Sequence, residues 1–212
     1  MPTSEYAPTD TLQPATPVGY QPPQPFRYSL VVLLGLVVVL LPVAAVVFGW
    51  LLWYAQGPAL DAVFSVDETA TSVTFTFASG LVAVACVGAI GIVTVLHELV
   101  HGLVYRWYGY RVSYGVAPQL GAFYAATFHQ FQARNHNLIV GIAPVVALNA
   151  VLLPVLFVPS PLVAFAAFVA LLFNTAGAAG DLYLVAMLLR TPAGSLMYDS
   201  DIRHSYIFYP EM

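Results

Sequence analysis

The sequence predicts an all-α membrane protein with four transmembrane helices and a short β-hairpin-like cytoplasmic loop between the second and third helices. Of the 212 residues, 60% are hydrophobic and only 8% are charged. A soluble domain carries about 25% charged residues to cover its surface. Four stretches, 29–55, 73–105, 139–158 and 162–189, are each apolar over the ~20 residues that a helix needs to cross a bilayer.

The N-terminal part is expected to consist of a tail and an anchor. Residues 1–27 contain seven prolines and little apolar surface, which predicts a disordered, proline-rich cytoplasmic tail. The first apolar run begins only near residue 28, without the basic region that opens a cleaved signal peptide. Residues 28–56 are therefore expected to form a retained first transmembrane anchor.

The other three spans lie within residues 73–192, and residues 193–212 are expected to form a cytoplasmic C-terminal segment. The second span is longer than a bilayer requires, so its helix tilts, protrudes or begins later than residue 73. Only residues 159–161 separate the third and fourth spans, which predicts an antiparallel helical hairpin. Between the second and third spans, two strand-like segments within residues 111–128 flank turn residues and predict a β-hairpin.

The basic residues predict the orientation of the chain. All six are arginines: Arg27, Arg106, Arg111, Arg134, Arg190 and Arg203. They lie in the tail, around the middle loop or after the fourth span, whereas the loops at 56–72 and 159–161 hold none. Because basic residues concentrate on the cytoplasmic side, we expect both termini and the middle loop to be cytoplasmic. The chain has no lysine and no basic patch, so we do not expect it to bind nucleic acid.

The second span ends in a pattern typical of zinc hydrolases, H-E-x-x-H, formed by His97, Glu98 and His101. On a helix, positions i and i+4 share a face, so two imidazoles can bind one metal while the glutamate acts on a metal-bound water. The motif also occurs by chance on soluble helices. Here it continues an apolar run, and an ionisable group within a span costs ~2.5 to 3.5 kcal/mol, so such groups usually serve a function.

A catalytic zinc site needs three protein ligands and one open position. Among the ten acidic residues, only Glu98 and Asp181 lie within the predicted spans. Asp181 and His97 each lie nine residues before an arginine at the predicted cytoplasmic end, so their depths match at about 13 Å. Asp181 is therefore the expected third ligand, and His129 or His136 could replace it if the middle loop folds inward.

Asn174 lies seven residues before Asp181, two turns along the same helix face. Two roles are open for it: contact with a zinc ligand or the substrate, or a hydrogen bond between helices, which asparagine commonly makes in lipid. Gly177 and Gly180 are expected to let a neighbouring helix approach closely beside Asp181.

This combination resembles the core of the site-2 protease group of intramembrane zinc metalloproteases. It is more closely similar to a small prokaryotic family of membrane proteins regarded as candidate zincin peptidases, through the segments 97–102, 143–144 and 174–181. The resemblance covers residues 75–192. Where the site-2 motif has Leu-Asp-Gly, this chain has Gly-Asp-Leu at residues 180–182.

The resemblance implies a multi-pass zinc metalloprotease of a prokaryotic cell membrane, with residues 73–192 as its core. It would cleave membrane proteins or peptides near the cytoplasmic half of the lipid bilayer. His97, His101 and Asp181 would bind zinc, Glu98 would transfer the proton, and the hairpin would hold the substrate extended. A catalytically inactive membrane scaffold of the same fold, or a proton or metal transporter, are the alternatives. The absence of an internal sequence repeat argues against a transporter.

Overall fold

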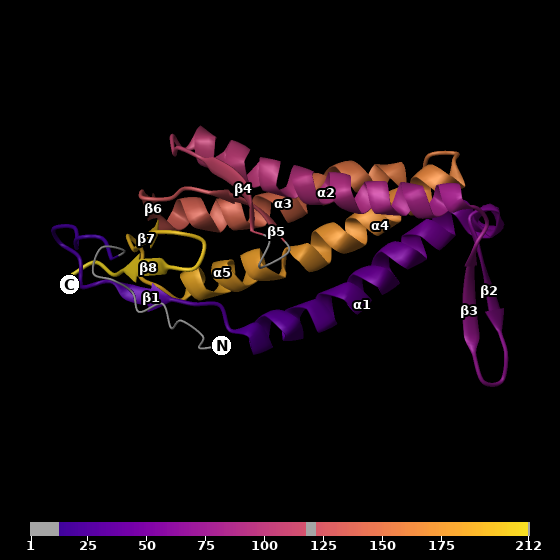
Figure 1. Ribbon diagram of the computed structural model, residues 1–212, viewed down its shortest axis with the longest axis horizontal. Helices are drawn as coiled ribbons and strands as arrows, with labels where there is room; N and C mark the ends of the chain where they lie inside the picture. The colour runs from indigo at the N-terminus through magenta and orange to yellow at the C-terminus, as the bar shows by residue number, and fades with distance from the viewer. Residues whose placement is uncertain (1–12, 118–121, 212) are drawn as a thin grey trace, which may run out of the picture.

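The computed structural model of the protein describes residues 13–117 and 122–211. Its helices are α1 (Leu30–Gln56), α2 (Gly80–Trp107), α3 (Arg134–Val155), α4 (Pro161–Gly177) and α5 (Ala179–Leu189), with the short 3-10 helix η1 (Gly57–Ala62). Counting α4 and α5 together, four helical segments are long and apolar enough to cross a membrane. They run side by side along the long axis of the molecule, and α4 packs against α1, α2 and α3 (Figure 1).

Of the three alternatives for the long second span, the structure shows the later start, because α2 begins at Gly80 rather than at residue 73. Val73–Phe77 forms strand β3, which pairs antiparallel with β2 (Phe64–Glu68). Its alternation of valine, threonine and phenylalanine suits a pleated surface better than a helix. The two strands form a ribbon that projects from one end of the helix bundle (Figure 1).

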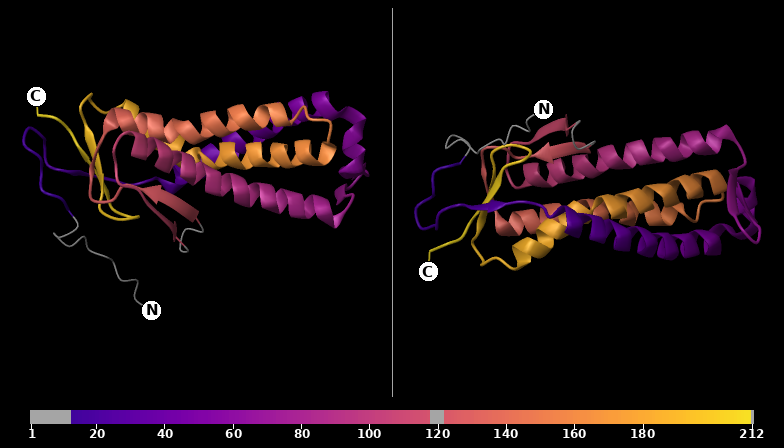
Figure 2. Two further views of the ribbon diagram at one scale, coloured as in Figure 1. Left: turned by 90° about the horizontal axis from the view of Figure 1, so that it is seen from above. Right: turned by 60° about the horizontal axis from the view of Figure 1, so that its bottom comes forward.

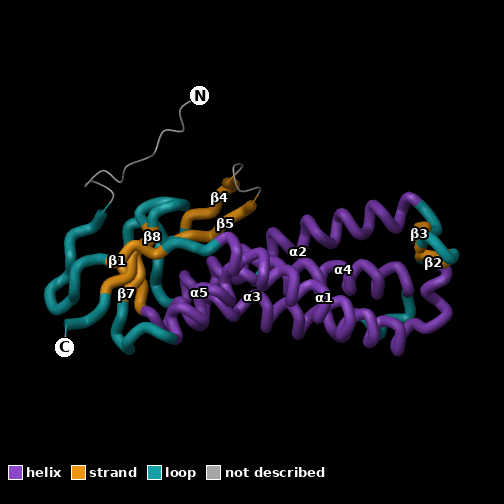
Figure 3. Tube along the Cα trace, turned by 90° about the horizontal axis from the view of Figure 1, so that it is seen from below, coloured by secondary structure: helices purple, strands orange, loops and turns teal. Residues whose placement is uncertain are grey.

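A four-stranded sheet lies at the other end of the bundle (Figures 2 and 3). Its strands are β1 (Gln24–Phe26), β6 (Phe131–Ala133), β7 (Leu196–Asp199) and β8 (Ser205–Phe208). They pair antiparallel in the order β1-β8-β7-β6, so the sheet joins the N-terminal segment, the chain before α3 and the C-terminal segment.

The prediction of a disordered tail is wrong for residues 24–26. These residues pair with residues 205–207 of β8, and Phe26 is buried against Leu188, Met197 and Ile207. Pairing with a distant strand supplies the buried apolar surface that the proline-rich segment lacks on its own. Residues 1–12 of the predicted tail lie outside the described residues.

The predicted β-hairpin in the middle loop is confirmed. Strand β4 (Ser113–Ala117) pairs antiparallel with β5 (Ala122–Ala126), and β5 lies against α2. Most of the predicted turn between them lies outside the described residues. The hairpin is thereby placed over the part of α2 that carries the H-E-x-x-H motif.

The fourth predicted span bends where α4 meets α5. The backbone hydrogen bonds continue through the bend, from the Ala178 amide to the Asn174 carbonyl and from the Leu182 amide to the Ala178 carbonyl. Ala178 is fully buried, so the bend lies in the core. It places Asp181 in the first turn of α5.

Two apolar clusters of buried side chains lie on either side of the polar residues of α4 and α5. The first cluster includes Leu156 and Leu171, and the second includes Leu188. Along the same helical path, Asn174 and Asp181 fall between Leu171 and Leu188. The polar residues are therefore held in the middle of a long apolar bundle.

The close approach of α3 to α5 depends on Gly141. A Cβ atom at this position would lie 2.8 Å from Cγ2 of Val185 and 3.5 Å from the backbone oxygen of Asp181. The prediction that Gly177 and Gly180 provide the close approach is wrong, because a Cβ built at either one meets no atom of another described helix or strand within 4 Å. Both glycines instead line a cavity beside Asp181.

We predict that Gly141→Ala lowers the thermal stability of the protein. Alanine improves helix propensity by about 1 kcal/mol, but overpacking against Val185 costs about 1–3 kcal/mol. The matched control is Gly88→Ala in α2, where a Cβ atom meets no described atom within 4 Å, so this variant should be as stable as the parent or more so. Thermal unfolding of both variants in detergent micelles tests this, and equal midpoints for the two would contradict it.

Candidate metal centre

Helix α2 presents His97 and His101 on one buried face, with side chains that are 10% and 9% exposed. Their Nε2 atoms both approach the carboxylate of Asp181 on α5. Nε2 of His97 lies 3.0 Å from Oδ2, and Nε2 of His101 lies 3.2 Å from Oδ1. The structure thus brings together the three side chains that the sequence predicts as zinc ligands.

The Nδ1 atom of His97 lies 2.9 Å from Oδ1 of Asn174 on α4. The orientation of the Asn174 amide follows from its other partners, because Nδ2 donates to the Pro144 carbonyl at 3.3 Å and to Oδ1 of Asn149 at 2.9 Å. The oxygen therefore faces His97 and accepts the Nδ1 proton. Of the two roles that the sequence leaves open for Asn174, its contacts include both: it bonds a predicted ligand and also joins helices.

The Nδ1 atom of His101 lies 3.0 Å from the backbone carbonyl of Val140 on α3. In a regular helix this carbonyl would accept the amide proton of residue 144, but that residue is Pro144, which has no amide proton. The carbonyl is free to accept the Nδ1 proton of His101 instead. Sequence reasoning missed Val140, although a proline inside a predicted span was a usable signal.

These hydrogen bonds place the proton of each neutral imidazole on Nδ1, so each Nε2 carries a lone pair. Two lone pairs and a carboxylate meet at 3.0 and 3.2 Å, an arrangement of three electron-pair donors that a bound cation would stabilise. Tetrahedral zinc, with ligand distances of about 2.0–2.1 Å, separates its ligand atoms by about 3.3 Å. The donor set and its spacing therefore fit zinc.

Glu98 is also near this point, since one ligand atom each of His97, Glu98 and His101 lie within 4.8 Å of one another. Its carboxylate has a different partner, however: Oε2 accepts the backbone amide proton of Ala125 at 2.8 Å. Asp181 rather than Glu98 contacts both Nε2 atoms, so Asp181 is the better third ligand. Glu98 is held beside the centre with one oxygen fixed by β5.

The hydrogen bond to Glu98 identifies the open edge of the hairpin. Ala125 lies opposite Tyr114 of β4 in the hairpin. Its amide donates to Glu98, so the backbone groups of Ala125 point away from β4. Because backbone groups alternate along an antiparallel strand, the amide and carbonyl of Phe123 face the same open edge. A strand edge with free backbone groups thus runs past Glu98.

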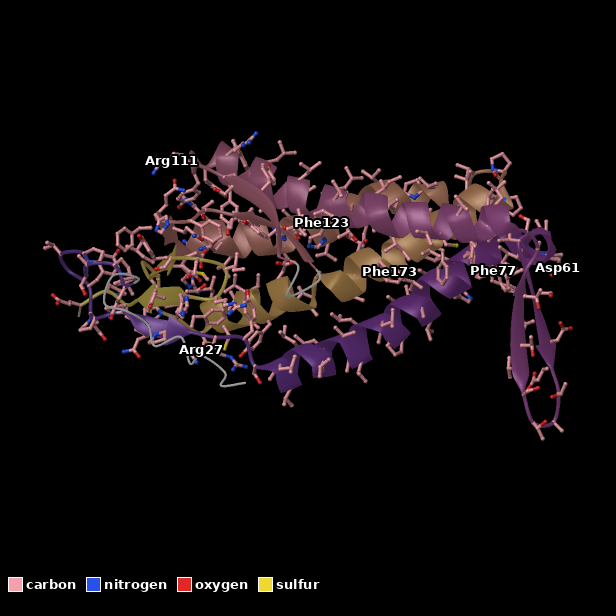
Figure 4. The ribbon with its side chains drawn as sticks, in the orientation of Figure 1. Arg27, Asp61, Phe77, Arg111, Phe123 and Phe173 are labelled. Atoms are coloured by element: carbon pink, nitrogen blue, oxygen red, sulfur yellow. The ribbon has the colours of Figure 1, made fainter. Side chains whose placement is uncertain are left out.

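Two cavities meet at the centre, and Glu98, Asp181 and Phe123 line both. The first, of about 270 Å³, also includes Phe173 of α4 in its wall. Figure 4 shows Phe123 and Phe173 over the middle of the bundle. The second, of about 240 Å³, extends toward the four-stranded sheet. An extended polypeptide that occupied both cavities would therefore pass Glu98 and Asp181.

The alternative third ligands lie elsewhere. The His136 ring stacks on Tyr108 with centroids 3.8 Å apart, and its Nδ1 lies 2.9 Å from the Tyr110 hydroxyl. The His129 ring contacts Tyr198 of the sheet, with centroids 6.3 Å apart. Neither lines the two cavities at the centre.

Comparison with protein-family models identifies a family for this chain. A family model described as "Putative zincin peptidase" matches residues 90–196, which is half of the chain and includes the H-E-x-x-H motif, the β4–β5 hairpin and α3 to α5. No curated protein matched the chain. No solved structure matched it either.

Proposed function

Because the chain belongs to the "Putative zincin peptidase" family, we propose that it is an intramembrane zinc metalloprotease of the site-2 type, acting on membrane proteins or peptides. The observation that carries this proposal is the convergence of His97, His101 and Asp181 at one point beside the carboxylate of Glu98. The family supports a metallopeptidase in general, and the position of the site within apolar helices supports action inside the bilayer.

In this proposal His97, His101 and Asp181 hold zinc, and Asn174 and the Val140 carbonyl orient the two imidazoles. Bound zinc would supply Lewis acidity, which activates water and polarises a peptide carbonyl. The Glu98 carboxylate accepts the proton of the attacking water and then donates it to the leaving nitrogen. The Ala125 amide holds one oxygen of Glu98, which leaves the other free for this transfer.

The open edge of β5 holds the substrate as an added strand. A peptide bond within a helix is hydrogen-bonded and shielded, so the cleaved segment must unwind, and unpaired backbone groups cost several kcal/mol in a bilayer. The free backbone groups of Phe123 pair with such a segment and place it beside Glu98. This supplies an extended substrate without leaving its polar groups unpaired.

The orientation follows from the charges. Arg27 and Arg111 lie toward the end of the molecule that carries the four-stranded sheet, whereas Asp61 lies at the ribbon end (Figure 4). By the positive-inside rule, the sheet end is cytoplasmic in a prokaryotic cell membrane, and the site lies nearer to that face.

We predict that purified protein contains about one zinc ion, and that His97→Ala, His101→Ala and Asp181→Ala each lose most of it. Glu98→Gln should retain zinc and lose cleavage activity by roughly 10²- to 10⁴-fold, the usual contribution of a general base. Metal analysis and a peptide cleavage assay measure the two effects. His136→Ala is the control, because its ring packs on Tyr108 away from the centre.

Two outcomes would contradict this assignment. Full zinc occupancy in Asp181→Ala would remove that residue as a ligand. Cleavage by Glu98→Gln at the parent rate would show that Glu98 is not the base. A zinc-loaded parent that cleaves no membrane peptide would favour the inactive scaffold.

We predict that Pro144→Ala weakens zinc binding by roughly 10- to 100-fold, the usual effect of losing a group that orients a ligand. The new amide proton of residue 144 would compete for the Val140 carbonyl and displace the Nδ1 proton of His101. Pro154→Ala is the matched control, since this proline lies in the same helix, ten residues further on. Competition with a zinc chelator measures both affinities, and equal values would refute this role of Pro144.

We predict opposite sidedness for Ser65 in β2 and Ser113 in β4, both of which are exposed. Single cysteines at these positions, in a Cys86→Ala background, should react differently with a membrane-impermeant maleimide. In intact cells only residue 65 should react, and in inside-out vesicles only residue 113. Reaction of both from one side would rule out the four-span topology.

A further inference from the structure

The cavity on the sheet side of the metal centre has polar residues that the proposed hydrolysis does not use. Glu98 and Asp181 line this cavity. Its wall also includes Tyr28, Asn137 and Asp199, which come from the N-terminal segment, α3 and β7. The volume of about 240 Å³ is slightly below the range for small-molecule pockets, which suits one side chain of a longer substrate.

Asp199 places a carboxylate in this wall without a cationic partner. Its oxygens accept hydrogen bonds from Nε2 of Gln132 at 2.9 Å and from the hydroxyl of Ser205 at 2.5 Å, and both donors are neutral. Within the described ranges, no arginine or histidine forms an ion pair with it. Burial raises its pKa, and the two hydrogen bonds oppose that shift. A half-buried carboxylate of this kind is stabilised when a cation binds beside it.

Asn137, which lines the same cavity, carries a buried hydrogen-bond donor without a partner among the described residues. Its side chain is 1% exposed, and its Oδ1 accepts the hydroxyl proton of Tyr105 at 2.9 Å. Its Nδ2 has no partner among the described residues. Asn137 lies one turn from Val140 on the face of α3 that meets the metal centre. A buried amide donor needs an acceptor, and one turn from Val140 that acceptor can be a peptide carbonyl near the cleaved bond.

We propose, on the basis of the proposed protease function, that this cavity binds the substrate residue on the cytoplasmic side of the cleaved bond and selects a lysine or arginine there. Asp199 pairs with the cationic head, and Asn137 donates to a substrate carbonyl. The aromatic ring of Tyr28 adds a surface on which a cation is favoured. Transmembrane segments carry their basic residues at the cytoplasmic end, which is the end that this cavity would receive.

Binding to the inactive variant Glu98→Gln tests the preference without cleavage. The probes are fluorescent transmembrane peptides in micelles that differ only in arginine or glutamine at one position, scanned along the cytoplasmic end. At one register the arginine peptide should bind roughly 10- to 100-fold more tightly, as expected for a hydrogen bond to a charged group. Adding Asp199→Asn should bring this ratio close to one.

The matched control is Asp201→Asn. Asp201 lies two residues after Asp199, its carboxylate contacts His204 at 2.8 Å, and it does not line the cavity. This variant should keep the preference for arginine. Two results overturn the proposal. One is an equal preference for arginine after Asp199→Asn and after Asp201→Asn. The other is no preference at any register in the protein that carries Glu98→Gln alone.

A second comparison tests Asn137. Asn137→Leu should weaken the binding of both peptides, because the carbonyl contact does not depend on the side chain of the substrate. Asn135→Leu, an exposed position in the same turn of α3 that does not line the cavity, is the control and should bind both peptides like the Glu98→Gln protein. If the peptides bind equally well to the Glu98→Gln protein with and without Asn137→Leu, the proposed role of Asn137 is wrong.

The binding data also separate this inference from the proposed function. If Glu98→Gln shows the arginine preference and loses it with Asp199→Asn, the inference stands even when the zinc-loaded parent cuts neither peptide. In that case only the hydrolysis fails. If the parent cuts both peptides at the same rate and the Glu98→Gln variant shows no preference, the hydrolysis stands and the inference fails.

Discussion

The orientation of two imidazole rings is the constraint on which the rest of the centre depends. Each ring gives its Nδ1 proton to an acceptor on another helix, Asn174 for His97 and the Val140 carbonyl for His101. Both Nε2 lone pairs then point to Asp181 on α5. The centre therefore exists only when α2, α3, α4 and α5 are at the correct depth relative to one another. Gly141 serves this requirement, because it lets α3 reach α5.

A polar centre in an apolar bundle needs a partner for every buried group. A chain of hydrogen bonds between side chains supplies many of these partners. His97 donates to Asn174, Asn174 donates to Asn149, and Asn149 donates to Thr175. The apolar clusters on either side keep this chain away from the ends of the bundle. In the described residues the buried exceptions are Thr127 Oγ1 and Asn137 Nδ2. Asn137 lines the cavity beside the centre, where the proposed substrate carbonyl would accept its proton.

Local patterns predicted the parts of the molecule that local physics determines. The helical spacing of His97 and His101, and the depth of Asp181, follow from helix geometry and the number of spans. Contacts between segments that are distant in the sequence leave no such local pattern from which they could be predicted. The pairing of β1 with β8, the bond from Ala125 to Glu98, and the space around Gly177 depend on how the whole chain packs. Composition alone also misassigned residues 73–77, since an apolar β-branched run suits a strand as well as a span.

The order of the strands in the sheet has a consequence for how the protein matures. Strands β1 and β6 do not pair with each other, because β8 and β7 lie between them in the sheet. During synthesis β6 has no partner until β7 has emerged, and β1 has none until β8 has emerged. Asp181 reaches the two histidines only when α5, the last helix, is in place. A nascent chain therefore lacks one of the three converging side chains until α5 has joined the bundle, so the order of synthesis delays the assembly of the site.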